Sequence, residues 1–149
     1  MTSQMTSRST PSELTDEFWA QASAGRLVRP VCGSCGRSFF TPRVACPHCL
    51  GTGWTYEQSS GRGAVVSHTT VHRGPDLSWP VPYTIGVVRM DEDWTLLTRL
   101  LVEPPDENAP GQLIGERVKV SFIDAHPPDH RRLPAFELSN DRENKEQPS

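Results

Sequence analysis

All four cysteines of this 149-residue chain lie in two CxxC pairs, Cys32–Cys35 and Cys46–Cys49, with ten residues between the pairs. In each pair both sulfurs point from one tight turn towards the same point, so two pairs provide four thiolates around one ion. Four thiolates complete the tetrahedral shell of a structural zinc, with Zn–S bonds of about 2.3 Å and no position open to substrate. The pattern therefore predicts a zinc ribbon whose metal has a structural role.

Two disulfides are the main alternative for the cysteines. Residues 1–17 are polar and rich in Ser and Thr, and they contain no apolar signal segment. Export to an oxidising compartment is therefore unsupported, and we expect a cytoplasmic protein. A redox CxxC motif usually occurs singly beside a βαβ pattern, which this chain lacks. The same four sulfurs can also bind iron, and the sequence leaves that choice open. Because four thiolates are present, we interpret His48 as a surface residue rather than a ligand.

The balance of charge bears on the class of partner. The chain has 15 basic and 18 acidic residues, a net charge of −3, and residues 61–138 carry 8 basic and 11 acidic side chains. Nucleic-acid-binding ribbons and barrels usually present a basic face, because neutralising phosphates supplies much of their affinity. This composition disfavours DNA or RNA as the partner. We keep nucleic-acid binding by a ribbon–barrel protein as the alternative hypothesis for the function.

An N-terminal helix is expected over residues 10–25, after a disordered segment at 1–9. Thr10 is the predicted N-cap, Glu13 completes a capping box, and Gly25 ends the helix. An apolar stripe follows at helical spacing; its members are Leu14, Phe18, Trp19 and Ala22. The stripe packs either on the protein's own β-strands or on another protein, and Phe18 and Trp19 are the candidates for the second role.

The remainder of the chain is predicted to be mainly β. The ribbon is expected over residues 26–60, and its strands are Leu27–Val31, Ser38–Thr41 and Trp54–Glu57. A second β-unit is expected over residues 61–138, and its strands are Gly63–Arg73, Tyr83–Met90, Trp94–Val102, Arg117–Asp124 and Leu133–Leu138. Five such strands, the first of them long, predict a small closed barrel of OB type, with an SH3-like barrel or a small sandwich as alternatives. Residues 139–149 read as a disordered polar tail.

The sequence offers little for catalysis. Every cysteine is assigned to the metal, no GxSxG turn presents a serine, and no glycine-rich phosphate or dinucleotide loop occurs. A free-standing enzyme would have to use His68 and His72 or His126 and His130. The loop before Tyr83 contains Trp79 and three prolines, and such stiff aromatic loops are good binding surfaces. The loop either caps its own barrel or contacts a partner, so Trp79 and Tyr83 join the candidate partner contacts.

The order of these motifs resembles a known family. The resemblance runs over about residues 14–138, and its motifs are Phe18-Trp19, Gly25-Arg26-Leu27, Cys32-x-x-Cys35-Gly36, Phe40-x-Pro42-Arg43, Cys46-Pro47-x-Cys49, Gly63 and Pro82-Tyr83. The chain is similar to the acyl-CoA-associated family that joins a rubredoxin-like zinc ribbon to an OB-fold, catalogued as domain of unknown function thirty-five. The segment Phe40–Cys49 is the most specific part of the match.

The resemblance implies a non-catalytic accessory subunit. Members of this family form complexes with thiolase-superfamily enzymes, including lipid-transfer-protein-like thiolases and aldolases of bacterial steroid side-chain breakdown. In some complexes the OB domain helps to hold the CoA part of the substrate. The implied cofactor is structural zinc on Cys32, Cys35, Cys46 and Cys49. Arg29, Arg37 and Arg43 are candidates to pair with CoA phosphates or with acidic residues of the partner.

Overall fold

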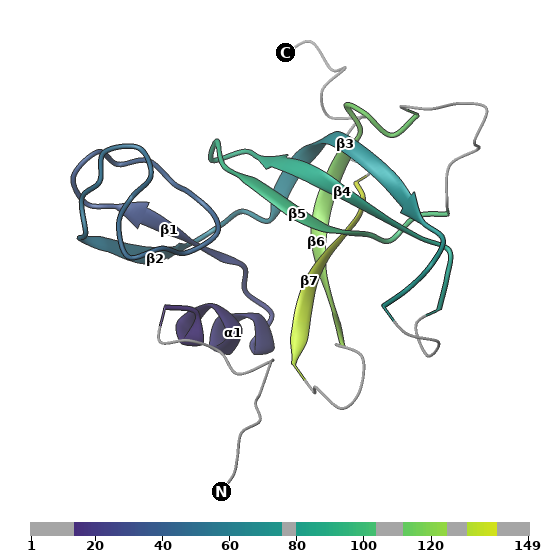
Figure 1. Ribbon diagram of the computed structural model, residues 1–149, viewed down its shortest axis with the longest axis horizontal. Helices are drawn as coiled ribbons and strands as arrows, with labels where there is room; N and C mark the ends of the chain where they lie inside the picture. The colour runs from purple at the N-terminus through teal and green to yellow at the C-terminus, as the bar shows by residue number, and fades with distance from the viewer. Residues whose placement is uncertain (1–13, 76–79, 104–111, 125–130, 140–149) are drawn as a thin grey trace, which may run out of the picture.

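A computed structural model describes residues 14–75, 80–103, 112–124 and 131–139 of the chain. Figure 1 shows a helix, a two-stranded ribbon and a β-barrel, in this order along the chain. Some predictions fall outside the described residues; they concern the segment 1–9, the Thr10–Glu13 capping box, Trp79, the His126 and His130 pair, and the tail from residue 140.

The helix α1 (Asp16–Ser23), the one helix among the described residues, ends in a glycine motif. Gly25 has a φ of +83°, a conformation that glycine adopts without steric cost. Its backbone N–H donates to the carbonyl of Ala22 at 3.0 Å, and the N–H of Arg26 donates to the carbonyl of Gln21 at 2.9 Å. These two bonds form a Schellman motif, so the predicted helix stop is confirmed.

The ribbon consists of β1 (Val28–Cys32) and β2 (Trp54–Gln58), which pair antiparallel. The third strand predicted at Ser38–Thr41 is wrong, because this segment makes only an isolated bridge between Ser38 and Val31. Beyond Ser38 this segment moves away from β1. Pro42 has no N–H to donate and does not extend the pairing.

The barrel closes in the order β3-β4-β5-β7-β6, and β6 pairs back onto β3. Its strands are β3 (Arg62–Val71), β4 (Tyr83–Met90), β5 (Thr95–Leu100), β6 (Arg117–Asp124) and β7 (Arg132–Leu138). Only the β5–β7 pair is parallel, and the other pairs are antiparallel. This is a closed five-strand barrel consistent with the OB-fold, so the predicted fold class is confirmed.

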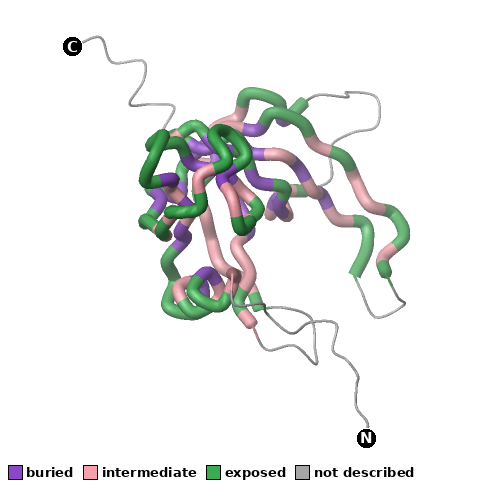
Figure 2. Tube along the Cα trace, turned by 60° about the vertical axis from the view of Figure 1, so that its left-hand side comes forward, coloured by how far each residue is buried: buried purple, intermediate pink, exposed green. Residues whose placement is uncertain are grey.

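Buried positions alternate with half-buried or exposed ones along β4 and β5, and Figure 2 colours the chain by burial. On β4 and β5 the buried positions face the barrel interior; they are Thr84, Gly86, Val88, Met90, Leu96, Thr98 and Leu100. The alternate positions face outwards; on the same two strands they include Tyr83, Ile85, Leu97 and Arg99. The outer face of β4 and β5 therefore carries large apolar side chains.

Two hydrophobic clusters organise the molecule. The larger one joins the helix and the ribbon to the barrel; it includes Phe18, Leu27, Val28, Met90, Trp94 and Phe136, with Phe40 packed against it. The smaller one lies within the ribbon and consists of Cys32, Phe39 and Cys46, with Trp54 against it. Neighbouring residues Phe39 and Phe40 thus belong to different clusters.

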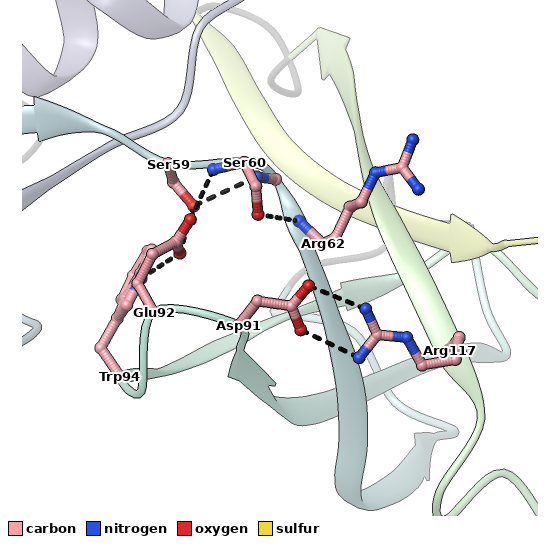
Figure 3. Close-up of polar contacts among 8 residues, drawn as sticks. Ser59, Ser60, Arg62, Asp91, Glu92, Trp94 and Arg117 are labelled. Carbon is pink, nitrogen blue, oxygen red and sulfur yellow. Dashed lines mark hydrogen bonds and ion pairs between the residues drawn. The ribbon is translucent and has the colours of Figure 1, made fainter. Parts of the chain in front are cut away.

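A carboxylate fixes the connection between ribbon and barrel (Figure 3). Glu92, in the β4–β5 turn, accepts hydrogen bonds from the Ser59 hydroxyl at 2.8 Å and from Trp94 Nε1 at 3.0 Å. Its second oxygen accepts the backbone N–H of Ser60 at 2.6 Å. The same turn carries Asp91, whose two oxygens accept from Arg117 on β6 at 2.9 Å each. The turn between β4 and β5 therefore anchors the linker that leaves the ribbon.

The ionised form of Glu92 is the one that makes these contacts. Partial burial alone would raise its pKa, but the N–H of Ser60 and the side chains of Trp94 and Ser59 donate to the carboxylate and hold the pKa below the ordinary value of 4.5. A carboxyl group whose pKa is lower in the folded protein contributes stability above its unfolded pKa. That contribution is lost as the pH falls through the folded pKa.

We expect Glu92→Gln to lower the free energy of unfolding by about 1–3 kcal/mol at pH 7, because the charge-assisted bonds to Ser59, Ser60 and Trp94 are weakened. The difference from the unmodified chain should shrink as the pH falls below 4.5. Urea denaturation at pH 7 and at lower pH measures it. Asp93→Asn is the matched control in the same turn, since Asp93 is exposed and Asn tolerates its φ of +65°. A loss for Glu92→Gln no larger than for the control would contradict this account.

Candidate functional site

The two CxxC turns have the same backbone geometry. In each turn the N–H four residues after the first cysteine donates to that cysteine's carbonyl, from Gly36 to Cys32 at 2.9 Å and from Leu50 to Cys46 at 2.8 Å. The N–H of Ser34 lies 3.3 Å from Cys32 Sγ, and the N–H of His48 lies 3.3 Å from Cys46 Sγ. These N–H groups stabilise negative charge on the sulfurs.

The four sulfurs converge on one point. All four Sγ atoms lie within 4.8 Å of one another. The Cys32–Cys49 pair is 3.5 Å apart and the Cys35–Cys46 pair 3.8 Å. A tetrahedron with Zn–S bonds of 2.3 Å has S–S edges of about 3.8 Å, whereas a disulfide requires about 2.05 Å. The geometry fits a metal ion, and the disulfide alternative is wrong because all four thiols are free.

Ionisation of the metal-free cysteines is uneven. The backbone N–H groups of Cys35 and Ser34 lower the pKa of Cys32 to about 6. The N–H of Gly51 also lowers the pKa of Cys49, but the neighbouring sulfurs of Cys32, Cys35 and Cys46 together with desolvation outweigh it, and the net pKa rises to about 11. Thiolates this close repel one another, so full ionisation needs a cation between them. This donor set suits zinc in a closed structural site, as predicted.

His48 is not needed as a ligand. Its side chain is exposed, and its Nε2 lies 3.3 Å from the carbonyl oxygen of Ser38. Arg29 also has a local role, because its guanidinium donates to the Ser38 hydroxyl at 2.9 Å and to the Gln58 carbonyl at 2.6 Å. Arg29 therefore stabilises the ribbon, and Arg37 and Arg43 remain the predicted arginine contacts.

An apolar groove of about 830 Å³ lies where the helix, the ribbon and the barrel meet. We call it the groove. Its walls come from three parts of the chain: Phe18 and Trp19 of the helix, Phe40–Pro42 of the ribbon, and side chains of the barrel strands. The barrel contribution includes Tyr83, Ile85, Leu97, Arg99, Ile123, Leu133 and Pro134.

A line of aromatic contacts holds the groove walls together. The ring of Phe18 lies 5.1 Å from that of Trp19 and 5.3 Å from that of Phe40. The Phe40 ring in turn lies 5.7 Å from that of Trp94 in the barrel. Aromatic pairs at these separations add to the free energy of burial. The helix, the ribbon and the barrel are thereby fixed relative to one another around the groove.

Three of the four predicted partner contacts line this groove. Phe18 does so from a buried position, with 4% of its surface exposed, so in this chain it belongs mainly to the core. Trp19 is half-buried beneath Arg131, whose guanidinium carbon lies 5.2 Å from the ring. Tyr83 is half-buried beneath Arg99, at 5.0 Å. Trp79 lies outside the described residues. Their role as partner contacts stays a prediction.

Sequence reasoning missed Phe40 and Leu97 as groove residues. Both stand in doubled apolar pairs, Phe39-Phe40 and Leu96-Leu97. Leu96-Leu97 lies on β5, where neighbouring side chains point to opposite faces, so that pair indicates one side chain that leaves the local core. Phe39-Phe40 lies outside the strands, and this argument does not apply to it. The signal for Leu97 was available in the sequence.

The histidine pair on the first barrel strand has a structural contact. His68 Nε2 accepts the backbone N–H of Leu113 at 3.3 Å, which ties β3 to the turn before β6. His72 lies just beyond the end of β3.

Among the described residues, no helix is both long and apolar enough to cross a bilayer.

The four-cysteine zinc ribbon and the OB barrel together define a class of protein in which these two modules are joined. Two family models match consecutive parts of the chain: "ChsH2, rubredoxin-like zinc ribbon domain" over residues 19–55 and "ChsH2, C-terminal OB-fold domain" over residues 56–122. Together they cover the greater part of the sequence. The chain belongs to the ChsH2-type ribbon–barrel family, also known as DUF35, as the motifs predicted.

Similar proteins carry related descriptions. A "DUF35 domain-containing scaffold protein" from Methanothermobacter thermautotrophicus is 28% identical over 98 residues, which cover 64% of this chain and 71% of the relative. A solved chain described as "Ltp2-ChsH2(DUF35) aldolase" is 27% identical with a TM-score of 0.73, covering 88% of this chain and 98% of the other. A DUF35 protein of unknown function from Sulfolobus solfataricus, 18% identical with a TM-score of 0.55, covers 85% of this chain and 86% of the other and supports the fold alone.

We expect Cys46→Ser to reduce the zinc content from about one ion per chain to nearly none and to unfold the ribbon, because the metal supplies much of so small a module's stability. His48→Gln is the matched control within the same turn and should keep its zinc. Elemental analysis of the purified variants gives the metal content. Zinc loss in His48→Gln, or full retention in Cys46→Ser, would contradict ligation by four thiolates.

Proposed function

We propose that this protein is a non-catalytic accessory subunit of a thiolase-superfamily enzyme that acts on acyl-CoA. The observation that carries the proposal is the similarity to the ChsH2(DUF35) aldolase chain, which extends over nearly the whole of both chains. The name of the archaeal relative, a scaffold protein, agrees with such a role. The partner in this proposal is a lipid-transfer-protein-like thiolase or retro-aldolase, with acyl-CoAs such as those of steroid side-chain breakdown as its substrates.

The chemistry of the described residues supports a binding role. The metal site is closed by four sulfurs, so it leaves no position at which a substrate could bind. One nitrogen of His68 is already bonded to the main chain. A surface for assembly is present instead, because the groove exposes aromatic and aliphatic side chains from three parts of the fold.

We place the partner contacts at the rim of the groove. Trp19 and Tyr83 each lie beneath an arginine there and combine apolar area with a fixed position. Trp79 belongs to the same proposal through its loop, and Phe18 packs edge-to-face against Trp19. Arg37 and Arg43 are proposed to meet the CoA phosphates or acidic residues of the partner.

The nucleic-acid alternative fits the barrel poorly. OB-folds bind oligonucleotides on the face of their second and third strands, which are β4 and β5 in this chain. Single-strand binders place basic and aromatic residues on that face. Here the outward positions carry three aliphatic side chains, Ile85, Val87 and Leu97, beside Tyr83, Arg89 and Arg99. The aliphatic side chains suit an apolar partner or ligand, and the net charge of −3 disfavours a phosphate backbone.

We expect a tagged form of the full chain, purified from its source organism at moderate salt, to bring down a thiolase-superfamily protein in comparable amount. Trp19→Ala and Tyr83→Ala should each lower this recovery at least roughly tenfold, with the zinc content unchanged. Mass spectrometry identifies and quantifies the partner. Single variants are preferable to a change at Phe18, because truncating that buried ring would destabilise the core by about 3–5 kcal/mol.

Val44→Ala serves as the control, since Val44 is an apolar residue with 68% of its surface exposed and lies outside the groove. Recovery of nucleic acid in place of an enzyme would contradict the proposal. Equal recovery with Trp19→Ala, Tyr83→Ala and Val44→Ala would show that the contact surface is elsewhere.

A further inference from the structure

Two of the four metal-binding cysteines lie at the surface of the ribbon. Cys35 and Cys49 are exposed, whereas Cys32 and Cys46 are buried. A bound zinc ion keeps each cysteine as the thiolate, which is the nucleophilic form of the side chain. Reaction of a thiolate with an oxidant depends on its exposure, so Cys35 and Cys49 are the two candidates for attack by reagents in solution.

The surroundings of Cys49 reduce its reactivity. The backbone N–H of Gly51 donates to Cys49 Sγ at 3.4 Å, and this bond stabilises negative charge on the sulfur. The same stretch of backbone lies close against the sulfur, since a Cβ atom at position 51 would be only 3.3 Å from Cys49 Sγ and 3.1 Å from the hydroxyl oxygen of Ser34. Cys49 is therefore exposed, but its sulfur is hydrogen-bonded and closely packed on one side.

Cys35 differs from Cys49 in its hydrogen bonding. The equivalent donor, two residues after Cys35, would be the N–H of Arg37, but among the described residues no N–H donates to Cys35 Sγ. The other three sulfurs each accept an N–H; the donors are Ser34, His48 and Gly51. A thiolate without such a bond keeps more of its charge on the sulfur and is the stronger nucleophile. Within the described chain, Cys35 thus combines exposure with a sulfur that accepts no N–H.

We propose that Cys35 is a modification site at which soft electrophiles, and peroxides in particular, attack the metal centre. Its partner in the reaction is Cys46, whose Sγ lies 3.8 Å from Cys35 Sγ. Oxidation-sensitive cysteines are often exposed thiolates with a second cysteine beside them, and Cys35 meets both conditions. Cys46 is buried, so it reacts with the neighbouring sulfur rather than with the reagent. This inference concerns the chain alone and does not depend on the proposed function.

The reaction takes two steps on sulfur. The Cys35 thiolate first attacks one oxygen of hydrogen peroxide, so that an S–O bond forms, the O–O bond breaks and hydroxide leaves. The Cys46 thiolate then attacks the sulfur of this sulfenic acid, so that an S–S bond forms, the S–O bond breaks and a second hydroxide leaves. Each sulfur loses one electron, and protons from solvent convert the two hydroxides to water.

The disulfide removes two of the four thiolates that hold the ion. The two that remain are too few for a structural site, so the chain loses its zinc. Cys46 also belongs to the small ribbon cluster with Phe39, against which Trp54 packs, and the new bond alters that packing. Peroxide therefore weakens the ribbon by way of Cys35.

A limiting amount of N-ethylmaleimide, added to the full-length, zinc-loaded chain, locates the reactive sulfur without any substitution. We expect chains that carry a single label to carry it on Cys35 at least about five times as often as on Cys49, because the two cysteines are both exposed and differ in their N–H donor. Fragmentation of the singly labelled chains in a mass spectrometer gives the ratio.

Hydrogen peroxide tests the reaction itself. We expect it to release zinc, measured with a chromogenic chelator, and to form the Cys35–Cys46 disulfide. Trypsin cleaves after Arg37 and Arg43 and so separates the two CxxC pairs into peptides of residues 27–37 and 44–62. A disulfide between Cys35 and Cys46 appears as a linked pair of these peptides, and their fragmentation identifies the two cysteines.

Cys35→His and Cys49→His are the matched variants, because structural zinc sites also form from three cysteines and one histidine. We expect peroxide to release zinc at least about fivefold more slowly from Cys35→His, and at nearly the unmodified rate from Cys49→His. If either variant takes up no zinc, the labelling ratio on the unmodified chain decides the matter.

Three results would overturn the inference. The first is a single label found on Cys49 as often as on Cys35. The second is zinc retained in peroxide by the unmodified chain. The third is zinc released with no disulfide between the two tryptic peptides.

Discussion

The four-thiolate metal site is the constraint on which the rest of the arrangement depends. The loop between the two cysteine pairs carries Phe39 and Phe40, and its ends are fixed by Cys35 and Cys46. Phe39 completes the small ribbon cluster, and Phe40 reaches the rings of the helix and the barrel. A ribbon with two five-residue strands has little apolar surface with which to offset the entropy of ordering this loop. The metal therefore determines where Phe40 lies, and Phe40 forms one wall of the groove.

The features that the sequence predicted are those fixed by local chemistry. Two CxxC pairs require a common ion whatever the rest of the chain does, and the doubled motif left few alternatives. Strands β4 and β6 have the predicted bounds. The polar turn Asp91–Asp93 marks the end of β4, and alternation along Arg117–Asp124 marks β6, and both are local patterns. Gly25 could be assigned as the helix end for the same reason, since a positive φ at that position favours glycine.

The features that the sequence did not predict arise from contacts between distant segments. Glu92 stands between two predicted strands, Tyr83–Met90 and Trp94–Val102, yet its carboxylate accepts hydrogen bonds from Ser59 and Ser60, 33 and 32 positions earlier in the chain. The apolar stripe on α1 predicted a buried face but not what packs against it. In the structure Phe18 is buried in the core, and Trp19 lines the groove. Helical periodicity does not distinguish an internal neighbour from an external one, so this division required the tertiary structure.

Ribbon, helix and barrel together form a rigid frame around an open apolar face. The frame is held by a metal, a line of four aromatic rings and the Glu92 contacts, none of which needs a ligand or a substrate for stability. On β4 and β5, where other OB-folds bind polymers, this chain presents aliphatic residues and one ring-supported arginine. In the proposed accessory role, this frame contributes surface and position to the active site of a partner enzyme, which supplies the reacting groups.

The most direct test of this account is acyl-CoA turnover, measured on the purified zinc-loaded chain alone and on the assembly that it forms with its partner enzyme. The account predicts no turnover by the chain alone and turnover by the assembly, with loss of activity when the two subunits are separated. Turnover of an acyl-CoA by the isolated chain, at a rate comparable with that of the assembly, would contradict the account.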